Sequence, residues 1–214
     1  MPSAYPPLNL AVRTPRLTLA AATDEMLERL VPIVRAGVVT EGAPLPFDDP
    51  MTLYDDSPAR EWGWMRRVWA GRSRVGADFW RLYFVVCDDG EPVGMQDLVG
   101  RDFTALGTVT TFSWLAPGVR GRGLGREARA AILHLAFEGL GAREAGSDAF
   151  TDNHASNRVS EALGYLRNGT DWATRRGEPA ELLRWRLPRD VWESRRRADI
   201  ELSCVEECRP VLGL

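Results

Sequence analysis

Three glycines at alternate positions mark the segment most able to do chemistry, Val119-Arg-Gly-Arg-Gly-Leu-Gly125. Glycine has no Cβ, so the backbone of this segment can approach a ligand closely. The apolar spacing that follows predicts a helix, whose free N–H groups and positive dipole end would face that ligand. The segment therefore indicates phosphate binding, although a tight strand-to-helix turn uses glycines for geometry alone.

Two common glycine-rich phosphate sites do not fit this segment. A Rossmann dinucleotide site follows the first parallel strand of a sheet and needs an acidic residue about 20 positions later. Here the preceding strands are expected to form an antiparallel meander. A Walker A site needs Gly-Lys followed by Ser or Thr, and the chain contains no lysine. The lack of lysine also excludes Schiff-base and lysine-nucleophile enzymes.

The elements that must position this segment follow from hydrophobic spacing. Asp88-Asp89-Gly90 is a hairpin signal between two apolar runs, and Thr23-Asp24 can cap a helix. Strands are expected at 16–20, 80–87, 93–98, 108–115, 144–150, from 165 onward and at 182–187. Helices are expected after 24, around the tryptophans at 62, 64 and 69, after 125 and over 153–163. This order predicts a mixed α/β sheet.

The 214 residues are expected to form one domain. Residues 1–12 are proline-rich and predict an irregular arm, 13–190 the domain, and 191–214 an apolar tail packed on the domain or on a partner subunit. A loop with several prolines and acidic residues is expected over 41–58.

Composition narrows the class of protein. No apolar run is long enough to span a bilayer, and the start lacks the pattern of a signal peptide, so a cytoplasmic location is expected. The net charge is −3 with scattered arginines, which argues against nucleic acid as a partner. The three cysteines lack the spacing of a disulfide framework or of a zinc site, so no metal is expected.

Two segments resemble motifs of one family. Arg120-Gly-Arg-Gly123-Leu-Gly125 matches the pyrophosphate-binding pattern Arg/Gln-x-x-Gly-x-Gly/Ala of the GNAT acetyltransferases. Asn153-His-Ala-Ser156 with Gly164-Tyr165 resembles the Asn-x-x-Ser helix ending in Gly-Phe of the ribosomal-protein alanine acetyltransferase (RimJ/RimL-like) branch. The segment from Thr14 to Leu19 is similar to the opening strand of that branch.

This resemblance implies the GNAT fold, a mixed and mostly antiparallel central sheet flanked by helices. It also implies an N-acetyltransferase that moves an acetyl group from acetyl-CoA to a primary amine. The glycine segment would bind the CoA pyrophosphate, and the strand before it would pair with the pantetheine arm. The residues expected to bind CoA are Trp114, Leu115, Arg120, Gly121, Arg122, Gly123, Leu124, Gly125, Arg126, Asn153, Ser156 and Arg158.

Ser156 is the residue that the resemblance places near the thioester sulfur, where a hydroxyl can protonate the leaving thiolate. Many GNAT enzymes have a tyrosine at the position of Ser160, one turn further along the helix, and its absence makes Ser156 the better candidate. The general base stays open. Asp97 and Asp148 on expected strands are candidates, as are Asp152 and His154 beside the second motif, and the more ordinary interpretation of each is a solvated or capping residue.

The acceptor is left open between a small-molecule amine and a protein N-terminus. Acidic residues within 48–56 would attract a cationic amine, or would simply be solvated. Acyl length and oligomeric state, a homodimer included, do not follow from the sequence. The alternative is a CoA-binding regulatory or structural protein without catalysis.

Overall fold

A computed structural model describes residues 3–40 and 42–214 of the chain. In this part of the chain one sheet has the strand order β7-β8-β6-β5-β4-β3-β2-β1-β9. The strands are β1 (Ala11–Arg13), β2 (Leu17–Ala21), β3 (Phe79–Asp88), β4 (Glu91–Arg101), β5 (Thr108–Leu115), β6 (Glu144–Phe150), β7 (Leu166–Arg175), β8 (Glu178–Pro188) and β9 (Glu201–Ser203). Neighbouring strands are antiparallel except β5 and β6, which are parallel. The predicted mixed α/β sheet is confirmed.

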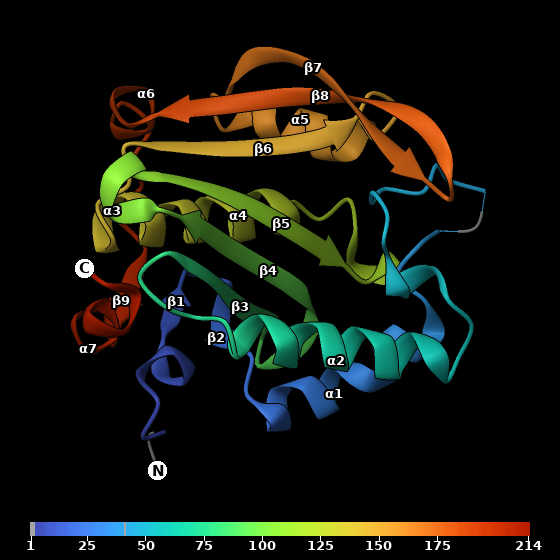
Figure 1. Ribbon diagram of the computed structural model, residues 1–214, viewed down its shortest axis with the longest axis horizontal. Coiled ribbons are helices and arrows are strands. Elements are labelled where there is room, and N and C mark those ends of the chain that lie inside the picture. The colour runs from blue at the N-terminus through green and yellow to red at the C-terminus, as the bar shows by residue number, and fades with distance from the viewer. Residues whose placement is uncertain (1–2, 41) are drawn as a thin grey trace.

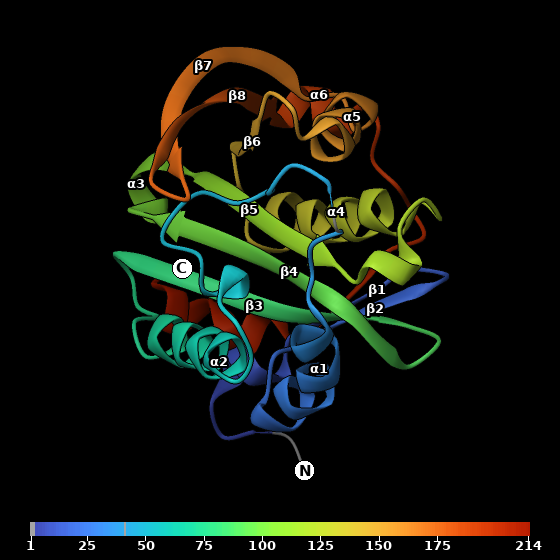
Figure 2. The ribbon, with the colours of Figure 1, turned by 90° about the vertical axis from the view of Figure 1, so that its right-hand side faces the viewer.

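Helices cover both faces of this sheet (Figures 1 and 2). On one face lie α1 (Asp24–Ala36) and α2 (Ala59–Arg72), and on the other lie α4 (Leu124–His134) and α5 (His154–Ala162). A π-helical turn, Leu135–Gly139, continues α4. Shorter helices are α3 (Phe103–Leu106), α6 (Arg189–Glu193) and α7 (Val205–Cys208). The sheet therefore separates two apolar cores, one under each pair of helices.

Local sequence signals explain the boundaries of several elements. The Thr23 side chain accepts a hydrogen bond from the Met26 N–H at 3.2 Å, which caps α1 as expected. Between β3 and β4, Asp89 and Gly90 have φ of 51° and 80°, the left-handed conformation that a two-residue hairpin requires. The expected strands at 108–115 and 144–150 have the observed bounds of β5 and β6.

The two chain ends meet in the sheet. Residues 11–13, at the end of the expected irregular arm, form β1, which pairs with both β2 and β9. Val12 is fully buried there because its side chain packs in the apolar core between the sheet and α4. Cys208 and Leu212 of the C-terminal segment are also fully buried, whereas Cys204 is exposed. Residues 1, 2 and 41, which belong to the expected arm and loop, lie outside the described residues.

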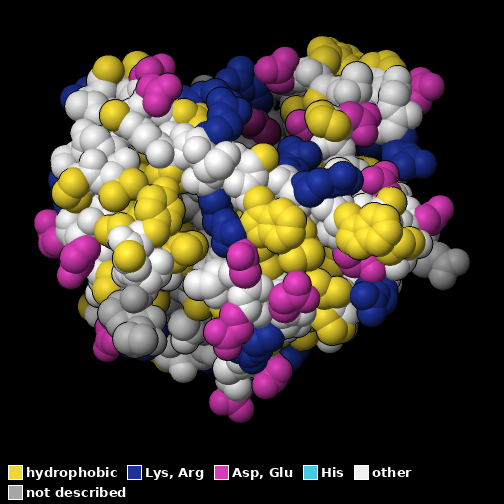
Figure 3. Space-filling model, turned by 60° about the horizontal axis from the view of Figure 1, so that its bottom comes forward, with side chains coloured by type: hydrophobic (Ala, Val, Ile, Leu, Met, Phe, Trp, Pro, Cys, Tyr) yellow, Lys and Arg dark blue, Asp and Glu magenta, His cyan; other side chains and the backbone are white. Residues whose placement is uncertain are grey.

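The tryptophans of α2 divide between core and surface. Trp64 is buried against Trp114 of β5, while 61% of Trp62 and 42% of Trp69 are exposed. Figure 3 shows hydrophobic side chains lying among charged ones on one side of the molecule. Among the described residues, no helix combines the length and the apolar character needed to cross a membrane.

Candidate active site

The site begins where β5 and β6 separate. Their pairing is limited to Thr108–Thr110 with Glu144–Gly146, although β5 continues to Leu115 and β6 to Phe150. One edge of β5 pairs with β4 along nearly its whole length, and beyond Thr110 the opposite edge pairs with no strand of the described residues. A cavity of about 680 Å³ opens there, with walls from β5, β6 and the first turns of α4 and α5. A free strand edge beside a cavity can take an extended ligand as an added strand.

The glycine segment ends in an uncapped helix start. Gly121 and Gly123 have φ of 78° and 81°, a conformation that residues with a Cβ rarely adopt. Gly123 is the N-cap of α4, and within residues 3–40 and 42–214 no side chain caps this end. The first N–H groups of α4 therefore lack intrahelical acceptors and lie at the cavity wall. These N–H groups and the helix dipole fit a pyrophosphate group.

Gly125 differs from the other two glycines. It lies inside α4 with helical geometry, and a Cβ placed on it would lie 3.7 Å from Leu115 Cδ1, an ordinary contact. The backbone requirement for glycine in this segment is therefore confined to Gly121 and Gly123.

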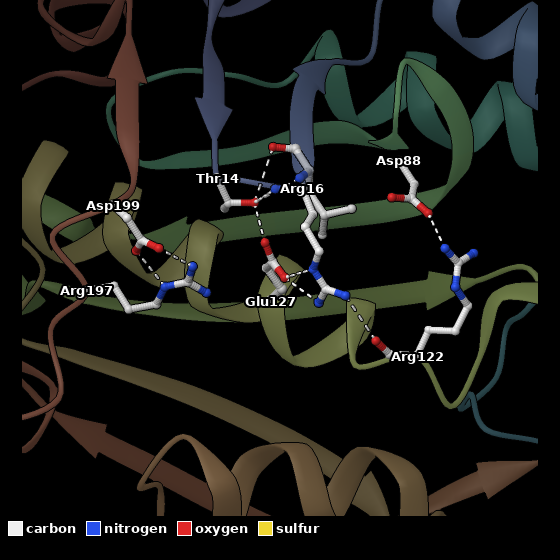
Figure 4. Close-up of polar contacts among 8 residues, drawn as sticks. Thr14, Arg16, Asp88, Arg122, Glu127, Arg197 and Asp199 are labelled. Carbon is white, nitrogen blue, oxygen red and sulfur yellow. Dashed lines mark hydrogen bonds and ion pairs between the residues drawn. The ribbon is translucent and has the colours of Figure 1, made fainter.

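A polar network holds the start of α4 in place (Figure 4). Glu127 accepts hydrogen bonds from the Thr14 hydroxyl at 2.6 Å and from Arg16 Nε at 2.7 Å. Arg16 also donates to the carbonyl oxygen of Arg122 at 3.3 Å. Burial alone would raise the pKa of Glu127, but these bonds from Thr14 and Arg16 hold it below its usual value. The opening segment of the domain thus fixes the glycine segment, a role that the sequence did not reveal.

Not every arginine expected to bind CoA lines the cavity. The Arg122 side chain turns away from Glu127 and forms an ion pair with Asp88 at 3.0 Å (Figure 4). The Arg120 guanidinium reaches the cavity wall, but it donates to the carbonyl oxygens of Leu115 and Val38 and to the Thr40 hydroxyl. Arg120 therefore holds the turn between β5 and α4. Arg158 lies outside the lining, and the remaining expected residues all belong to it.

The second motif places one serine at the cavity and buries the other. Asn153 caps α5, since its side-chain oxygen accepts from the Ser156 N–H at 3.2 Å. Ser156 is partly exposed and lines the cavity. Ser160 is fully buried, and its hydroxyl donates to the Ser156 carbonyl at 3.4 Å. Of the two hydroxyls, that of Ser156 is available to a ligand.

The two candidate bases occupy different environments. Asp97 is buried on the α1 and α2 side, where one carboxylate oxygen accepts from Arg81 Nε at 2.9 Å and Nη2 at 2.6 Å. It does not line the cavity. Asp148 does, with a half-exposed side chain 3.9 Å from Arg184. Burial raises the pKa of Asp148, and Arg184 offsets this only in part. The structure thus brings Asp148, and not Asp97, to the same cavity as Ser156.

The acidic loop contributes less to the cavity than its composition suggests. Asp48 belongs to the lining, whereas Asp55 and Asp56 do not. Asp49 accepts a hydrogen bond from the Gly177 N–H at 2.9 Å, which ties the loop to the β7–β8 hairpin. Asp152, beside the second motif, is paired with Arg175 at 2.8 Å, and this bond lowers its pKa.

A further lining residue, Arg129, escaped the sequence analysis. Its side chain is buried, and its Nη1 donates to the Ser147 hydroxyl at 3.1 Å. The available signal was an arginine on an apolar helix face, because Ile132, Leu133 and Ala136 follow it at helical spacing.

Comparison with known proteins agrees with this arrangement. Residues 16–166 match the model of the acetyltransferase (GNAT) domain family. A GCN5-related N-acetyltransferase from Brucella melitensis is similar in structure, with a TM-score of 0.65 and 18% identity over 86% of this chain and 80% of that one. Mutant forms of the spermidine/spermine N-acetyltransferase SpeG from Vibrio cholerae match with a TM-score of 0.63 and 14% identity, over 85% of this chain and 99% of that one. The ribosomal L7/L12 alpha-N-protein acetyltransferase RimL, in complex with coenzyme A, matches with a TM-score of 0.62 and 17% identity, over 83% of this chain and 97% of that one.

The solved structures share the fold, and the family model covers most of the chain, from Arg16, just before β2, to Leu166, the first residue of β7. The glycine segment, the diverging strands and the capped serine helix all lie within that match. The chain therefore belongs to the GNAT family and is an N-acetyltransferase.

Proposed function

We propose that the protein moves an acetyl group from acetyl-CoA directly to an amine while both are bound, with the reaction centred between Ser156 and Asp148. The observation that carries this proposal is the single cavity that joins the uncapped start of α4 to both side chains. This cavity is lined by an anion site, a free strand edge, a hydroxyl and a carboxylate.

At the donor end, the N–H groups after Gly123 bind the pyrophosphate and the free edge of β5 pairs with the pantetheine arm. The Ser156 hydroxyl donates a hydrogen bond to the leaving thiolate. A thiol with a pKa of about 8.5 needs only modest help to leave at neutral pH, so one hydroxyl suffices.

At the acceptor end, Asp148 takes the proton from the attacking amine. Asp97 instead holds the Arg81 guanidinium at the cavity wall. Asp48 and Asp148 give this end carboxylates that attract a cationic amine. We infer an acceptor that is either a small-molecule amine or a protein N-terminus, and the two relatives named for a polyamine and for a ribosomal protein represent these classes.

The test is a thiol-release assay with acetyl-CoA over a panel of polyamines, other small amines and N-terminal peptides. We expect turnover with at least one class, together with binding of CoA in calorimetry. CoA binding without turnover on any amine would instead indicate a regulatory protein, and absence of CoA binding would overturn the donor site.

The pH dependence tests the role of Asp148. Because its pKa is raised, the carboxylate loses its ability to accept a proton as pH falls through a value above the ordinary one. We expect kcat to rise with pH through this range and then to level off. Asp148→Asn should lower kcat about 100-fold or more and remove this limb, whereas Asp152→Asn should keep it. An unchanged pH profile in Asp148→Asn would exclude Asp148 as the base.

A further inference from the structure

Arg129 lies at the point where β5 and β6 separate. It belongs to the second turn of α4, and only 5% of the residue is exposed. Its Nη1 donates to the Ser147 hydroxyl on β6 at 3.1 Å, and its Nη2 donates to the Ser113 hydroxyl on β5 at 3.4 Å. The guanidinium thus spans the gap between the two diverging strands.

The charge of Arg129 is not neutralised within the described residues, where no carboxylate lies within ion-pair distance of it. Arg81, which is less deeply buried, has Asp97 as its partner. Burial lowers the pKa of Arg129, yet a guanidinium stays protonated in proteins. A buried cation whose partners are all uncharged hydroxyls is costly unless an anion joins it.

The other groups around Arg129 are uncharged. Its own Nε–H has no acceptor among the described residues, and the buried hydroxyls of Tyr165, beside Arg129, and of Thr111, beside Tyr165, bring no negative charge. Burial raises the pKa of Tyr165, and the neighbouring Arg129 offsets this in part. Arg129, Thr111, Ser113 and Ser147 all line the same cavity as Ser156, so a ligand in the cavity can reach this cluster.

The position of Arg129 identifies which part of a ligand it meets. The pyrophosphate site is at the first turn of α4, and Arg129 follows Gly123 by six residues, about 9 Å along the helix axis. This is too far for the same phosphate. Since the strands converge at the Arg129 end of the cavity, the group that arrives there is the acyl end of the donor.

We propose that Arg129 binds a carboxylate at the end of the acyl chain, so that the protein accepts short dicarboxylic acyl-CoA donors, of which succinyl-CoA is the probe, in addition to acetyl-CoA. The inference rests on the proposed function, because it requires CoA in this cavity. An acetyl group has no charge to pair with the guanidinium. A distal carboxylate can accept two parallel hydrogen bonds from it.

The reaction keeps the chemistry of acetyl transfer. The amine nitrogen bonds to the thioester carbonyl carbon, the C–S bond breaks, and the electron pair leaves on sulfur. The amine proton goes to Asp148, the thiolate is protonated with the help of Ser156, and the distal carboxylate is unchanged.

Calorimetry with the full chain tests the proposal by comparing the dissociation constants of acetyl-CoA and succinyl-CoA. We expect the wild-type protein to bind succinyl-CoA about tenfold to hundredfold more tightly, the range for a hydrogen-bonded charged group. Arg129→Met should bring the ratio of the two constants to about one, and Arg129→Lys should keep part of the preference. Arg143→Met, which removes an equal charge from an exposed position outside the cavity, should keep all of it.

Equal affinities of the wild-type protein for the two donors would overturn the inference, and so would an unchanged ratio in Arg129→Met. If Arg129→Met does not fold, the test rests on the ratio of the two dissociation constants in the wild-type protein and in Arg129→Lys. A lower kcat of Arg129→Met with acetyl-CoA, in a protein whose wild type binds both donors equally, would mean that Arg129 stabilises charge developing on the thioester. That result would likewise overturn the inference. Failure of both donors to bind is a separate result, which removes the proposed function itself.

Discussion

The donor and acceptor ends of the cavity are built in different ways. The donor end uses backbone N–H groups, two glycines with positive φ, and a clamp in which Arg16 and Thr14 hold Glu127. The acceptor end uses carboxylate side chains, Asp48 from a loop and Asp148 from β6. Backbone geometry specified by one short segment tolerates little change, whereas side chains from distant segments can be exchanged one at a time. We infer that donor binding is the fixed property of this fold and acceptor choice the adjustable one.

The largest effect is expected where the two ends meet. Ser156→Ala should lower kcat about 100-fold to 1000-fold, because the hydroxyl acts on charge that develops on the leaving group. The dissociation constant of acetyl-CoA should change little, since the start of α4 is untouched.

Ser160→Ala is the matched control for this variant. The same atom is removed one helical turn away, but from a buried residue outside the cavity. Its effect on kcat should be much smaller. Near wild-type turnover in Ser156→Ala would transfer the acid role to water or to Ser160.

The donor end can be tested by replacing each of two glycines, Gly123 and Gly125, with alanine. Gly123→Ala forces a Cβ into the left-handed conformation and should weaken CoA binding about fivefold to thirtyfold. Gly125→Ala, with helical geometry and only an ordinary contact to Leu115, should have a smaller effect. Calorimetric titration with CoA measures both variants. Equal losses of affinity in Gly123→Ala and Gly125→Ala would show that glycine is required because the ligand approaches the backbone closely, and not because of the positive φ of Gly123.

The clamp at the donor end, in which Thr14 and Arg16 hold Glu127, should contribute to the free energy of unfolding. Glu127→Gln removes the negative charge and replaces one of the two oxygens that accept from Thr14 and Arg16 by an NH2 group, so it should lower the free energy of unfolding by about 1–3 kcal/mol at neutral pH. Because the folded-state pKa of Glu127 is lowered, its contribution is present above the unfolded value of about 4.3. The contribution is lost as pH falls through the folded-state value.

Urea unfolding at pH 7 and below pH 4 measures this difference. Glu138→Gln is the control, because Glu138 forms an exposed ion pair with Arg196 and should contribute little. A destabilisation by Glu127→Gln that is equal at both pH values would mean that packing, rather than the ionised carboxylate, holds the helix start.

Sequence reasoning predicted the elements whose signals are local. The β-branched and aromatic residues of β5, the hairpin at Asp89-Gly90 and the helix after the glycines are signals carried by neighbours along the chain. It did not predict β1, because three residues carry too little pattern and their partners in β9 come almost two hundred residues later.

The same limit applies to the site: sequence reasoning predicted residues within one short segment, but not contacts between distant segments. The residues from Gly121 to Arg126 lie at the cavity except Arg122, whose side chain is drawn away by Asp88 from another strand. The sequence could not separate Asp97 from Asp148, because the difference is made by Arg81, a neighbour across the sheet. Arg129 was missed for a similar reason, since its serine partners lie on two different strands.

The arginines around the cavity have one more consequence. All 27 positions that are lysine or arginine are arginine, including Arg120, Arg126 and Arg129 in the cavity wall. A guanidinium remains protonated and is not a nucleophile at neutral pH, whereas a lysine amine in a dry cavity can lose its proton and react. In the proposed reaction, the cavity that holds the activated thioester therefore offers it no lysine amine, so no lysine of the enzyme can be acylated in place of the acceptor.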